Sequence, residues 1–367
     1  MWKRLILIFV LLSFANSNKV VSVEFFPSCY IADITIYTPK VNIDMNLNTY
    51  LQYSKIEDFE LEVNFEKKDS SIKGYQSEYI TSFTLNNSTN NEIKGYHFLI
   101  DTEDSFIPSV GLSLAYHYDD EAFSIVHSMY NSKLIDYKAF TFDFNNSEIH
   151  FGFVDNDIGF PYSGYCDIEK GYNTWGCNVT LFQYDTIELK INSYYVFHSG
   201  YFNIISSDEF FDFMTEKVFK EQMNQKLCQI MGEETDGEKK LICNEEAMSN
   251  FSNITMKIGS MTVTLTKEDI FSSGKNGSYE SDFINNPYDA TKGYPPCLIG
   301  HNFLKIMNRT TFDYHTKRVS FYSDRVKIEM QNSNNNKLIY IIYAIGILCF
   351  ISTIMIVFTY FKHGINI

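Results

Sequence analysis

The chain has 367 residues, a formal net charge of -15 at pH 7, and an abundance of aromatic residues, with 32 Phe and 26 Tyr. The negative charge argues against nucleic acid or an anionic lipid surface as the natural partner. No cysteine spacing resembles a zinc site, and we expect neither a metal nor another cofactor. β-Branched residues alternate with polar ones over many short segments, which predicts an all-β chain.

The N-terminus has the pattern of a secretory signal peptide over residues 1–17. Two basic residues precede an unbroken apolar run from Leu5 to Leu12, and small residues follow at Ala15 and Ser17. This order of basic, apolar and small residues predicts export and cleavage. The apolar run is too short to span a bilayer as an anchor. We therefore expect the chain to enter the secretory pathway.

The first functional motif lies between Cys29 and Ser54. An alternating segment ends in Thr38-Pro39, and Asn48-Thr49-Tyr50 stands nine residues past the proline. This arrangement resembles the first catalytic hairpin of the pepsin family of aspartic peptidases, where Gly-Thr-Pro is followed at the same distance by Asp-Thr-Gly. The resemblance implies a bilobal pepsin-like fold, with two β lobes around a cleft and one catalytic loop in each. It also places Asn48 at the position of the first catalytic aspartate.

Four later segments resemble the same family in the correct order. Residues 108–114 are similar to the buried apolar-Gly segment beside the first loop. Residues 140–155 are similar to the strand pair that closes the first lobe. Residues 195–200 are similar to the second catalytic loop, which places His198 at the second aspartate. Residues 297–321 are similar to the last strands of the family.

This resemblance implies an N-terminal β lobe over residues 24–165 and a C-terminal β lobe over residues 166–324. Two helices are predicted among the strands. One lies near residues 121–131, and the other runs from Asp208 to Leu227, where apolar residues recur at helical spacing. Asp208 has a short acceptor side chain and is expected to cap the second helix.

The loss of both aspartates is the main functional prediction. Aspartic-peptidase chemistry uses two carboxylates that share one proton, so that one accepts a proton from water while the other donates. The amide of Asn48 cannot act as a base near neutral pH, and His198 would be a cation in an acidic lumen. We expect no catalytic residue in the two loops. A neutral His198 is expected to hydrogen-bond Asn48 or Ser199.

The flanking positions indicate that the loop architecture is kept. The resemblance implies that the hydroxyls of Thr49 and Ser199 brace the two loops against each other, and Gly200 retains one of the family's glycines. Tyr50 replaces the other glycine and puts a bulky ring where the backbone normally approaches closely. His301 replaces the usual aspartate after Ile299-Gly300 and is expected to fill a lobe core.

Three functions remain open from the sequence. The leading hypothesis is a catalytically inactive pseudo-peptidase that binds a protein or peptide partner, with Tyr50, Tyr75 and His198 as binding residues. Tyr75 is the candidate for the tyrosine of the flap that covers the family's cleft. The second hypothesis is an active aspartic-type endopeptidase that uses His198 with another acid. The third is a glycosylated surface coat protein.

Cysteines and sequons fit an extracellular domain. Six of the seven cysteines precede the last apolar segment and can pair fully in an oxidising compartment. We predict the local pairs Cys166–Cys177 and Cys228–Cys243 and leave Cys29 and Cys297 open. Eight acceptor sequons for N-glycans suit a surface protein. Their asparagines are Asn86, Asn87, Asn145, Asn178, Asn250, Asn253, Asn276 and Asn308.

The C-terminal end predicts a membrane anchor. Residues 325–337 are polar and Asn-rich, as is typical of a stalk. Residues 338–361 carry no charge and form a predicted transmembrane helix, long enough at about 1.5 Å per residue to cross about 30 Å of hydrocarbon. Residues 362–367 remain as a cytoplasmic tail, which gives type I topology with a luminal or extracellular N-terminus. A lipid anchor is the alternative, but charged residues follow the apolar run.

Overall fold

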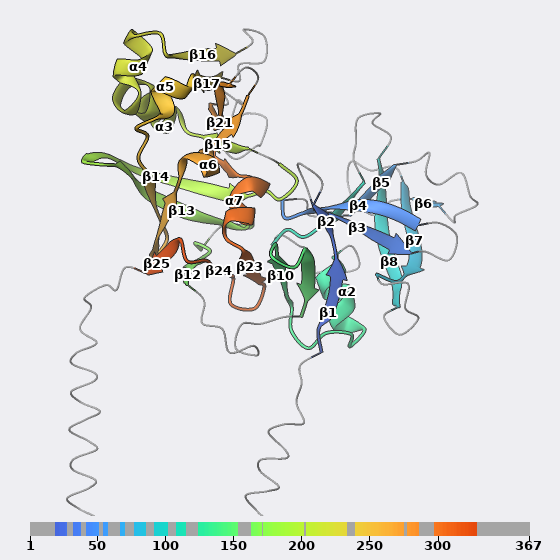
Figure 1. Ribbon diagram of the computed structural model, residues 1–367. Coiled ribbons are helices and arrows are strands. Elements are labelled where there is room, and N and C mark those ends of the chain that lie inside the picture. Colours follow the sequence, from blue (N-terminus) through green and yellow to red (C-terminus); the bar gives the residue numbers. More distant parts are fainter. Residues whose placement is uncertain are drawn as a thin grey trace, which may run out of the picture. The chain divides into compact units, whose positions relative to one another are not determined.

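The computed structural model describes residues between Lys19 and Ile328, with internal gaps (Figure 1). The described residues belong to one compact unit that ends at Ile328. They cover 19–27, 32–37, 42–50, 54–57, 67–69, 77–85, 92–101, 108–114, 124–152, 163–170, 172–201, 203–232, 239–274, 277–285 and 297–328.

The two predicted membrane-related segments lie outside these ranges. Residues 1–17, predicted as a signal peptide, and residues 338–361 and 362–367, predicted as span and tail, are not described. Within the part of the chain that is described, no helix is both long and apolar enough to cross a bilayer. The anchor therefore stays a prediction from sequence.

An eight-stranded sheet carries the first loop. Strands β3 and β4 form the predicted hairpin, in which buried Ile34 pairs with buried Met45 and Ile36 with Ile43. Alternate side chains of a strand point to the same face, so this apolar period sets the register. The sheet order is β2-β3-β4-β9-β5-β8-β7-β6. The strands are β2 (Phe26–Pro27), β3 (Ala32–Tyr37), β4 (Asn42–Asn48), β5 (Lys55–Glu57), β6 (Lys67–Asp69), β7 (Ser77–Phe83), β8 (Ile93–Asp101) and β9 (Ser109–Gly111).

An eleven-stranded sheet carries the second loop. Its order is β16-β17-β21-β15-β22-β14-β13-β18-β19-β25, and β20 pairs with β21. The predicted disulfide Cys228–Cys243 is present and joins directly opposed residues of β16 and β17. The strands are β13 (Gly176–Tyr184), β14 (Ile187–Phe197), β15 (Ile204–Ser206), β16 (Cys228–Gly232), β17 (Lys239–Cys243), β18 (Ile254–Ile258), β19 (Met261–Leu265), β20 (Phe271–Ser273), β21 (Tyr279–Asn285), β22 (Leu298–Ile299) and β25 (Val326–Ile328).

A six-stranded sheet combines strands from both predicted lobes, in the order β1-β11-β10-β23-β24-β12. The colours of Figure 1 show that blue, green and orange-red parts of the chain contribute to it. Buried Phe140 on β10 stacks on buried Phe312 on β23, with ring centroids 4.7 Å apart. The strands are β1 (Val21–Glu24), β10 (Ala139–Asp143), β11 (Glu148–Phe151), β12 (Gly164–Asp167), β23 (Arg309–Asp313) and β24 (Arg318–Tyr322).

The predicted start of the N-terminal lobe at residue 24 and the predicted end of the C-terminal lobe at residue 324 are both wrong. Strand β1 pairs with β11 from Val21 onward, three residues before the predicted start at residue 24. Strand β25 pairs with β19, and Arg325 makes an ion pair with Asp269, so residues 325–328 are folded and not part of a stalk. The polarity of residues 325–337 concealed β25, because this strand has only three residues and Lys327 lies between its two apolar ones.

The helices are shorter than predicted. Helix α2 (Ile125–Asn131) lies within the first predicted range, and the second range divides into α3 (Asp208–Phe213), a π-helical segment (Met214–Val218) and α4 (Lys220–Asn224). Ser207, and not Asp208, caps α3, because the Ser207 side chain accepts a hydrogen bond from Phe210 N. Asp208 Oδ1 instead accepts from Asn285 Nδ2 at 2.8 Å. Three short helices were not predicted: α5 (Glu245–Met248), α6 (Lys267–Ile270) and α7 (His301–Ile306).

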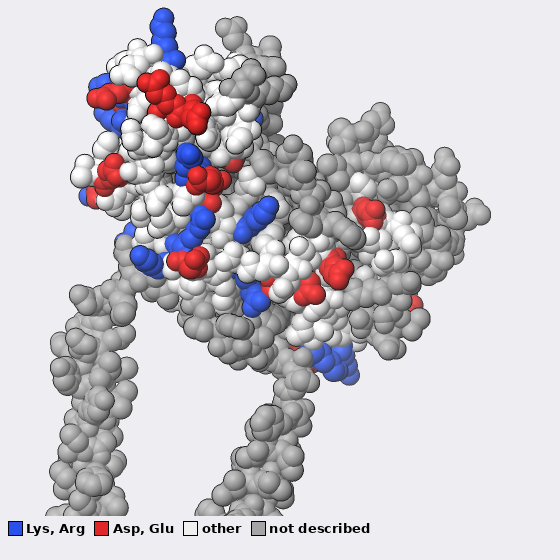
Figure 2. Space-filling view, viewed as in Figure 1, with Lys and Arg blue, Asp and Glu red and all other residues white. Residues whose placement is uncertain are grey.

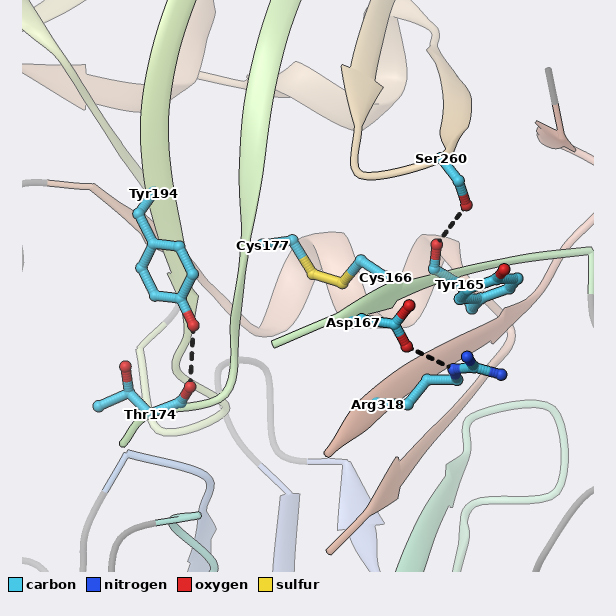
Figure 3. Close-up of a disulfide and its surroundings, with 8 residues drawn as sticks. All are labelled: Tyr165, Cys166, Asp167, Thr174, Cys177, Tyr194, Ser260 and Arg318. Atoms are coloured by element: carbon cyan, nitrogen blue, oxygen red, sulfur yellow. Dashed lines mark hydrogen bonds and ion pairs between the residues drawn. A yellow bond between two sulfur atoms is a disulfide. The ribbon is translucent and has the colours of Figure 1, made fainter. Parts of the chain in front are cut away.

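The second predicted disulfide, Cys166–Cys177, joins β12 of the six-stranded sheet to β13 of the eleven-stranded sheet (Figure 3). Beside it, Arg318 Nε donates to Asp167 Oδ1 at 2.7 Å, and Ser260 Oγ donates to the Tyr165 carbonyl at 2.9 Å. Cys297 is buried and has no disulfide partner among the described residues, so full pairing of the six cysteines stays a prediction. Cys29 lies outside them.

Candidate functional site

The site is built on a strand pattern that occurs twice. In the first sheet β4 runs parallel to β9, β9 pairs antiparallel with β5, and β5 runs parallel to β8. In the second sheet β14, β22, β15 and β21 repeat these three pairings in the same senses. The Asn48-Thr49-Tyr50 loop begins at the end of β4, and the His198-Ser199-Gly200 loop follows β14. The two loops therefore hold equivalent places in the two halves of the pattern.

Reciprocal hydrogen bonds join the loops. Thr49 N donates to Ser199 Oγ at 2.9 Å, and Ser199 N donates to Thr49 Oγ1 at 3.0 Å. Each hydroxyl then donates to a strand carbonyl of the opposite half: Thr49 to Phe197 at 2.8 Å, and Ser199 to Leu47 at 2.5 Å. Both side chains are completely buried. The hydroxyls thus satisfy backbone groups that have no water available.

Asn48 and Gly200 are in close contact. Asn48 is buried, and its Oδ1 accepts a hydrogen bond from Tyr50 N at 2.9 Å. A Cβ atom added to Gly200 would lie 2.6 Å from Asn48 Nδ2 and 3.0 Å from Asn46 Oδ1. Gly200 is therefore required by this approach of one loop to the other, since no side chain fits between them.

His198 makes a different contact from the one expected. Its ring stacks on Tyr50, with centroids 5.0 Å apart and planes inclined by 18°, and Tyr201 meets it edge-on. The expected side-chain hydrogen bond to Asn48 or Ser199 is not formed. Among the described residues, His198 Nδ1 has no hydrogen-bond partner. Tyr50, at the place that Gly200 holds in the other loop, supplies the ring that covers the imidazole.

The charge state of His198 also requires correction. Burial lowers the pKa of His198 from 6.5 to about 4, because the desolvated imidazole disfavours its charged form. His198 is therefore neutral above about pH 4, whereas the ordinary pKa of histidine had predicted a cation in an acidic compartment. His301, at the start of α7, is buried as expected and packs edge-on against Phe144. Burial likewise lowers its pKa to about 4.

Neither loop contains a carboxylate. Within the described ranges, the buried carboxylates are Asp143, Asp269 and Asp282, and each has a partner elsewhere. Asp143 accepts from Arg309 Nε at 3.1 Å, and Asp269 pairs with Arg325. Within the same ranges, no group of three or more His, Cys, Asp or Glu side chains is arranged to hold a metal ion. The loops thus present an amide, an imidazole, hydroxyls and a phenol.

A small apolar cluster adjoins the two loops, and sequence reasoning missed it. Tyr50, Tyr194 and Tyr201 pack, partly buried, on a core formed by Val196, Ile205, Ile284 and Leu298. Tyr172 extends this set, because its ring stacks on Tyr194 with centroids 3.7 Å apart and remains 43% exposed. The alternation of β14 could have placed Tyr194 on the same face as Val196, but only the fold brings Tyr201 and Tyr50 to it.

The other predicted site residues are distributed as follows. Tyr75, Asn86, Asn87 and Asn276 lie outside the described residues. Asn145, Asn250 and Asn253 are exposed, whereas Asn178 and Asn308 are half-buried. Asn178 Nδ2 donates to Asn192 Oδ1 at 2.8 Å.

Comparison with known proteins identifies the family. A family model described as eukaryotic aspartyl protease matches residues 79–323, which are 245 of the 367 residues. The chain belongs to the eukaryotic aspartyl protease family. This family member is also similar in fold to the aspartic proteinase from Irpex lacteus, with a TM-score of 0.62 and 14% sequence identity over 86% of this chain and 99% of that one. No curated protein matches its sequence.

The match to the family model begins after the first loop, so the position of Asn48 rests on the repeated strand pattern and the contacts to the second loop. In this family member Asn48 and His198 follow equivalent strands and are joined through Thr49 and Ser199. The two residues thus occupy equivalent places in the repeated strand pattern.

Proposed function

We propose that this member of the aspartyl protease family is a pseudo-peptidase, which does not cleave peptide bonds and acts by binding a peptide or protein partner. The observation that carries the proposal is the pair Asn48 and His198, at the ends of β4 and β14, in loops whose Thr49–Ser199 hydrogen bonds are intact. The architecture of the two loops is kept, whereas the paired carboxylates are replaced.

The chemistry of these side chains opposes hydrolysis. Two neighbouring carboxyl groups share one proton because they cannot both ionise, so the ionised group acts as the base and the protonated group acts as the acid. An amide and a neutral imidazole cannot form such a pair, because the amide neither accepts nor releases a proton near neutral pH. Tyr50 also covers one face of His198, which limits the approach of water to the ring.

A binding role fits the side chains around the loops. Tyr50, Tyr194 and Tyr201 are partly exposed aromatic residues on an apolar base, and aromatic residues are enriched in the cores of protein interfaces. Figure 2 shows positive and negative side chains interspersed on the face in view, without a large area of one sign. A partner held by aromatic contacts and backbone hydrogen bonds fits these three tyrosines.

We further propose that the protein acts in the secretory pathway or at the cell surface as a glycosylated, type I membrane protein. The sequence patterns at residues 1–17 and 338–361 support this placement. The disulfides Cys166–Cys177 and Cys228–Cys243 add support, because such bonds persist mainly in oxidising compartments.

An active endopeptidase is the second candidate, and His198 is the observation that favours it. The imidazole is unprotonated above about pH 4, and its Nδ1 has no partner among the described residues, so it is available to act as a base. Such an enzyme would need an acid from a residue outside the two loops. A surface coat protein is the remaining alternative.

Proteolysis assays separate the first two candidates. The purified full-length chain is incubated with denatured protein substrates at about pH 3 to 7, the interval that contains the carboxyl and imidazole pKa values. No cleavage is expected from the unchanged chain. The variant Asn48→Asp/Tyr50→Gly/His198→Asp restores both carboxylates and the glycine, and its gain of cleavage would show that the remaining loop architecture is competent. Cleavage by the unchanged chain that is lost in His198→Ala would favour the endopeptidase.

Binding is tested on an array of extended synthetic peptides. Retention of a peptide subset by the unchanged chain, weakened by Tyr50→Gly and Tyr201→Ala, is expected for the pseudo-peptidase. Tyr137→Ala provides a matched control, because Tyr137 is a 43% exposed tyrosine outside this cluster. Equal retention by all variants, or none by the unchanged chain, would contradict binding of peptides at the loops and favour the coat protein.

A further inference from the structure

Asn308 lies in the wall of a polar cavity of about 520 Å³. The cavity is bounded by α6, α7 and the residues that precede β25, including Asp324 and Arg325. Its volume is within the roughly 300–1,000 Å³ of small-molecule sites. Asn308 is also the acceptor of the sequon Asn308-Arg309-Thr310, so a glycan attached there starts at the cavity wall.

The backbone of Asn308 is fixed by its neighbours. Asn308 N donates to the Lys305 carbonyl at 3.2 Å, and the Asn308 carbonyl accepts from Phe144 N at 2.8 Å. Its φ of 58° is in the left-handed region, which asparagine tolerates better than most residues. The folded chain therefore sets the position of the Asn308 Cα from which an attached sugar extends.

The cavity lining suits an N-acetylated sugar. Lys305 and Arg325 provide N–H donors, whereas Glu268 and Asp324 provide acceptors. Ile306 adds an apolar surface. N-Acetylglucosamine has an acetamide carbonyl and ring oxygen that accept, hydroxyls and an amide N–H that donate, and C–H faces that pack on apolar side chains. Arg325 is itself held in place by its ion pair with Asp269.

We propose that the N-glycan of Asn308 folds back onto the protein, so that its first N-acetylglucosamine lies in this cavity and links α6, α7 and the segment before β25. The inference depends on passage through the secretory pathway and is independent of the pseudo-peptidase role. It assigns a structural function to one sequon among eight.

The covalent step must precede folding. In the transfer, Asn308 Nδ2 forms a bond to C1 of the first sugar, the bond from C1 to the oxygen of a lipid-linked pyrophosphate donor breaks, and an amide proton is released. The hydroxyl of Thr310 is required in the sequon, but Thr310 is completely buried on β23. The sugar is therefore attached to the extended chain and enters the cavity as β23 forms.

The first experiment compares deglycosylation at two sites. Asn145 is the matched site, because it is exposed on the turn between β10 and β11. The full-length chain is expressed in a eukaryotic secretory host and treated, while folded, with a peptide N-glycosidase that cleaves the sugar–asparagine bond. Mass spectrometry is expected to show release from Asn308 at least about tenfold slower than from Asn145, equivalent to about 1.4 kcal/mol. The two rates should become equal after denaturation.

The second experiment uses two ways to remove the glycan. Asn308→Gln changes the cavity wall, whereas Thr310→Val leaves Asn308 in place and replaces a hydroxyl that has no hydrogen-bond partner among the described residues. Both variants are expected to lower the Tm of protein from the eukaryotic host by about 2–4 °C, the shift typical of 1 kcal/mol in a domain of this order of size. Thr310→Val should leave the Tm unchanged or raise it slightly in protein from a bacterial host, which adds no glycan.

Lys305→Ala tests the cavity itself. Its effect on the Tm should be larger in glycosylated protein than in bacterial protein, because only the former has a sugar for Lys305 to contact. The proposal is overturned if Asn308 carries no glycan in the eukaryotic host. It is also overturned if release is equally fast at Asn308 and Asn145, or if Thr310→Val changes the Tm equally in both hosts.

Discussion

Replacement of Thr49 by Val tests the hydrogen bonds that join the two loops. The hydroxyl of Thr49 accepts from Ser199 N and donates to the Phe197 carbonyl, and all three groups are buried. Val has nearly the same shape but no polar atom, so a backbone N–H and a backbone C=O lose their partners. At about 1–3 kcal/mol for each buried group left without a partner, the loss is about 2–6 kcal/mol.

The free energy of unfolding is measured by urea denaturation of chain produced without N-glycans in an oxidising bacterial periplasm. Thr310→Val is the matched control. It is the same substitution at a completely buried position whose hydroxyl has no partner among the described residues, and it should be neutral or slightly stabilising. If Thr49→Val costs no more than Thr310→Val, the loops are not joined as described. A double-mutant cycle with Ser199→Ala should give a coupling energy of about 0.5–3 kcal/mol.

Three further changes test other contacts of the fold by the same unfolding assay. Gly200→Ala should destabilise by about 1–3 kcal/mol because its Cβ would meet Asn48 Nδ2 at 2.6 Å, and adding Asn48→Ala should recover most of that loss. Burial lowers the pKa of His301 to about 4, so between about pH 6.5 and 4 the unfolded chain binds a proton that the folded chain does not. The free energy of unfolding should therefore fall as the pH falls through this interval, by up to about 3 kcal/mol for His301. His301→Phe should remove this contribution to the pH dependence of stability. An unchanged pH dependence in that variant would refute the lowered pKa of His301. Arg309→Ala should cost about 3–5 kcal/mol, because it leaves the buried Asp143 carboxylate without its guanidinium, whereas a change below 1 kcal/mol would mean that the pair is solvated.

The sequence was sufficient for features that depend on local patterns. The resemblance of residues 29–54 to the family's first catalytic hairpin predicted the β3–β4 hairpin, whose buried residues Ile34, Ile36, Ile43 and Met45 alternate with the strand period of two. The short separations of the cysteines favoured the two disulfides that the structure contains. The order of the motifs gave the family, which the family model then matched over residues 79–323.

Contacts between distant parts of the chain that the family resemblance does not imply could not be predicted. The ring of Tyr50 meets that of His198 across nearly 150 positions of sequence, and this contact contributes to the burial that lowers the pKa of His198. The hydrogen bond that the sequence suggested for His198 was wrong because nothing local indicates which way the imidazole turns. The capping of α3 by Ser207 differs from the expected Asp208 by one residue, the usual uncertainty at a helix end.

The shared six-stranded sheet has a consequence for biosynthesis. Strand β10 pairs along its whole length with β23, which is made about 170 residues later, and β1 joins this sheet by pairing with β11. In a nascent chain, the edge of β10 that faces β23 therefore stays unpaired until the chain has been synthesised as far as residue 313. Such long-range pairing is slow and leaves strands available to wrong partners. A premature stop before Arg309 would thus remove a neighbour from the N-terminal half as well as the last strands of the C-terminal half.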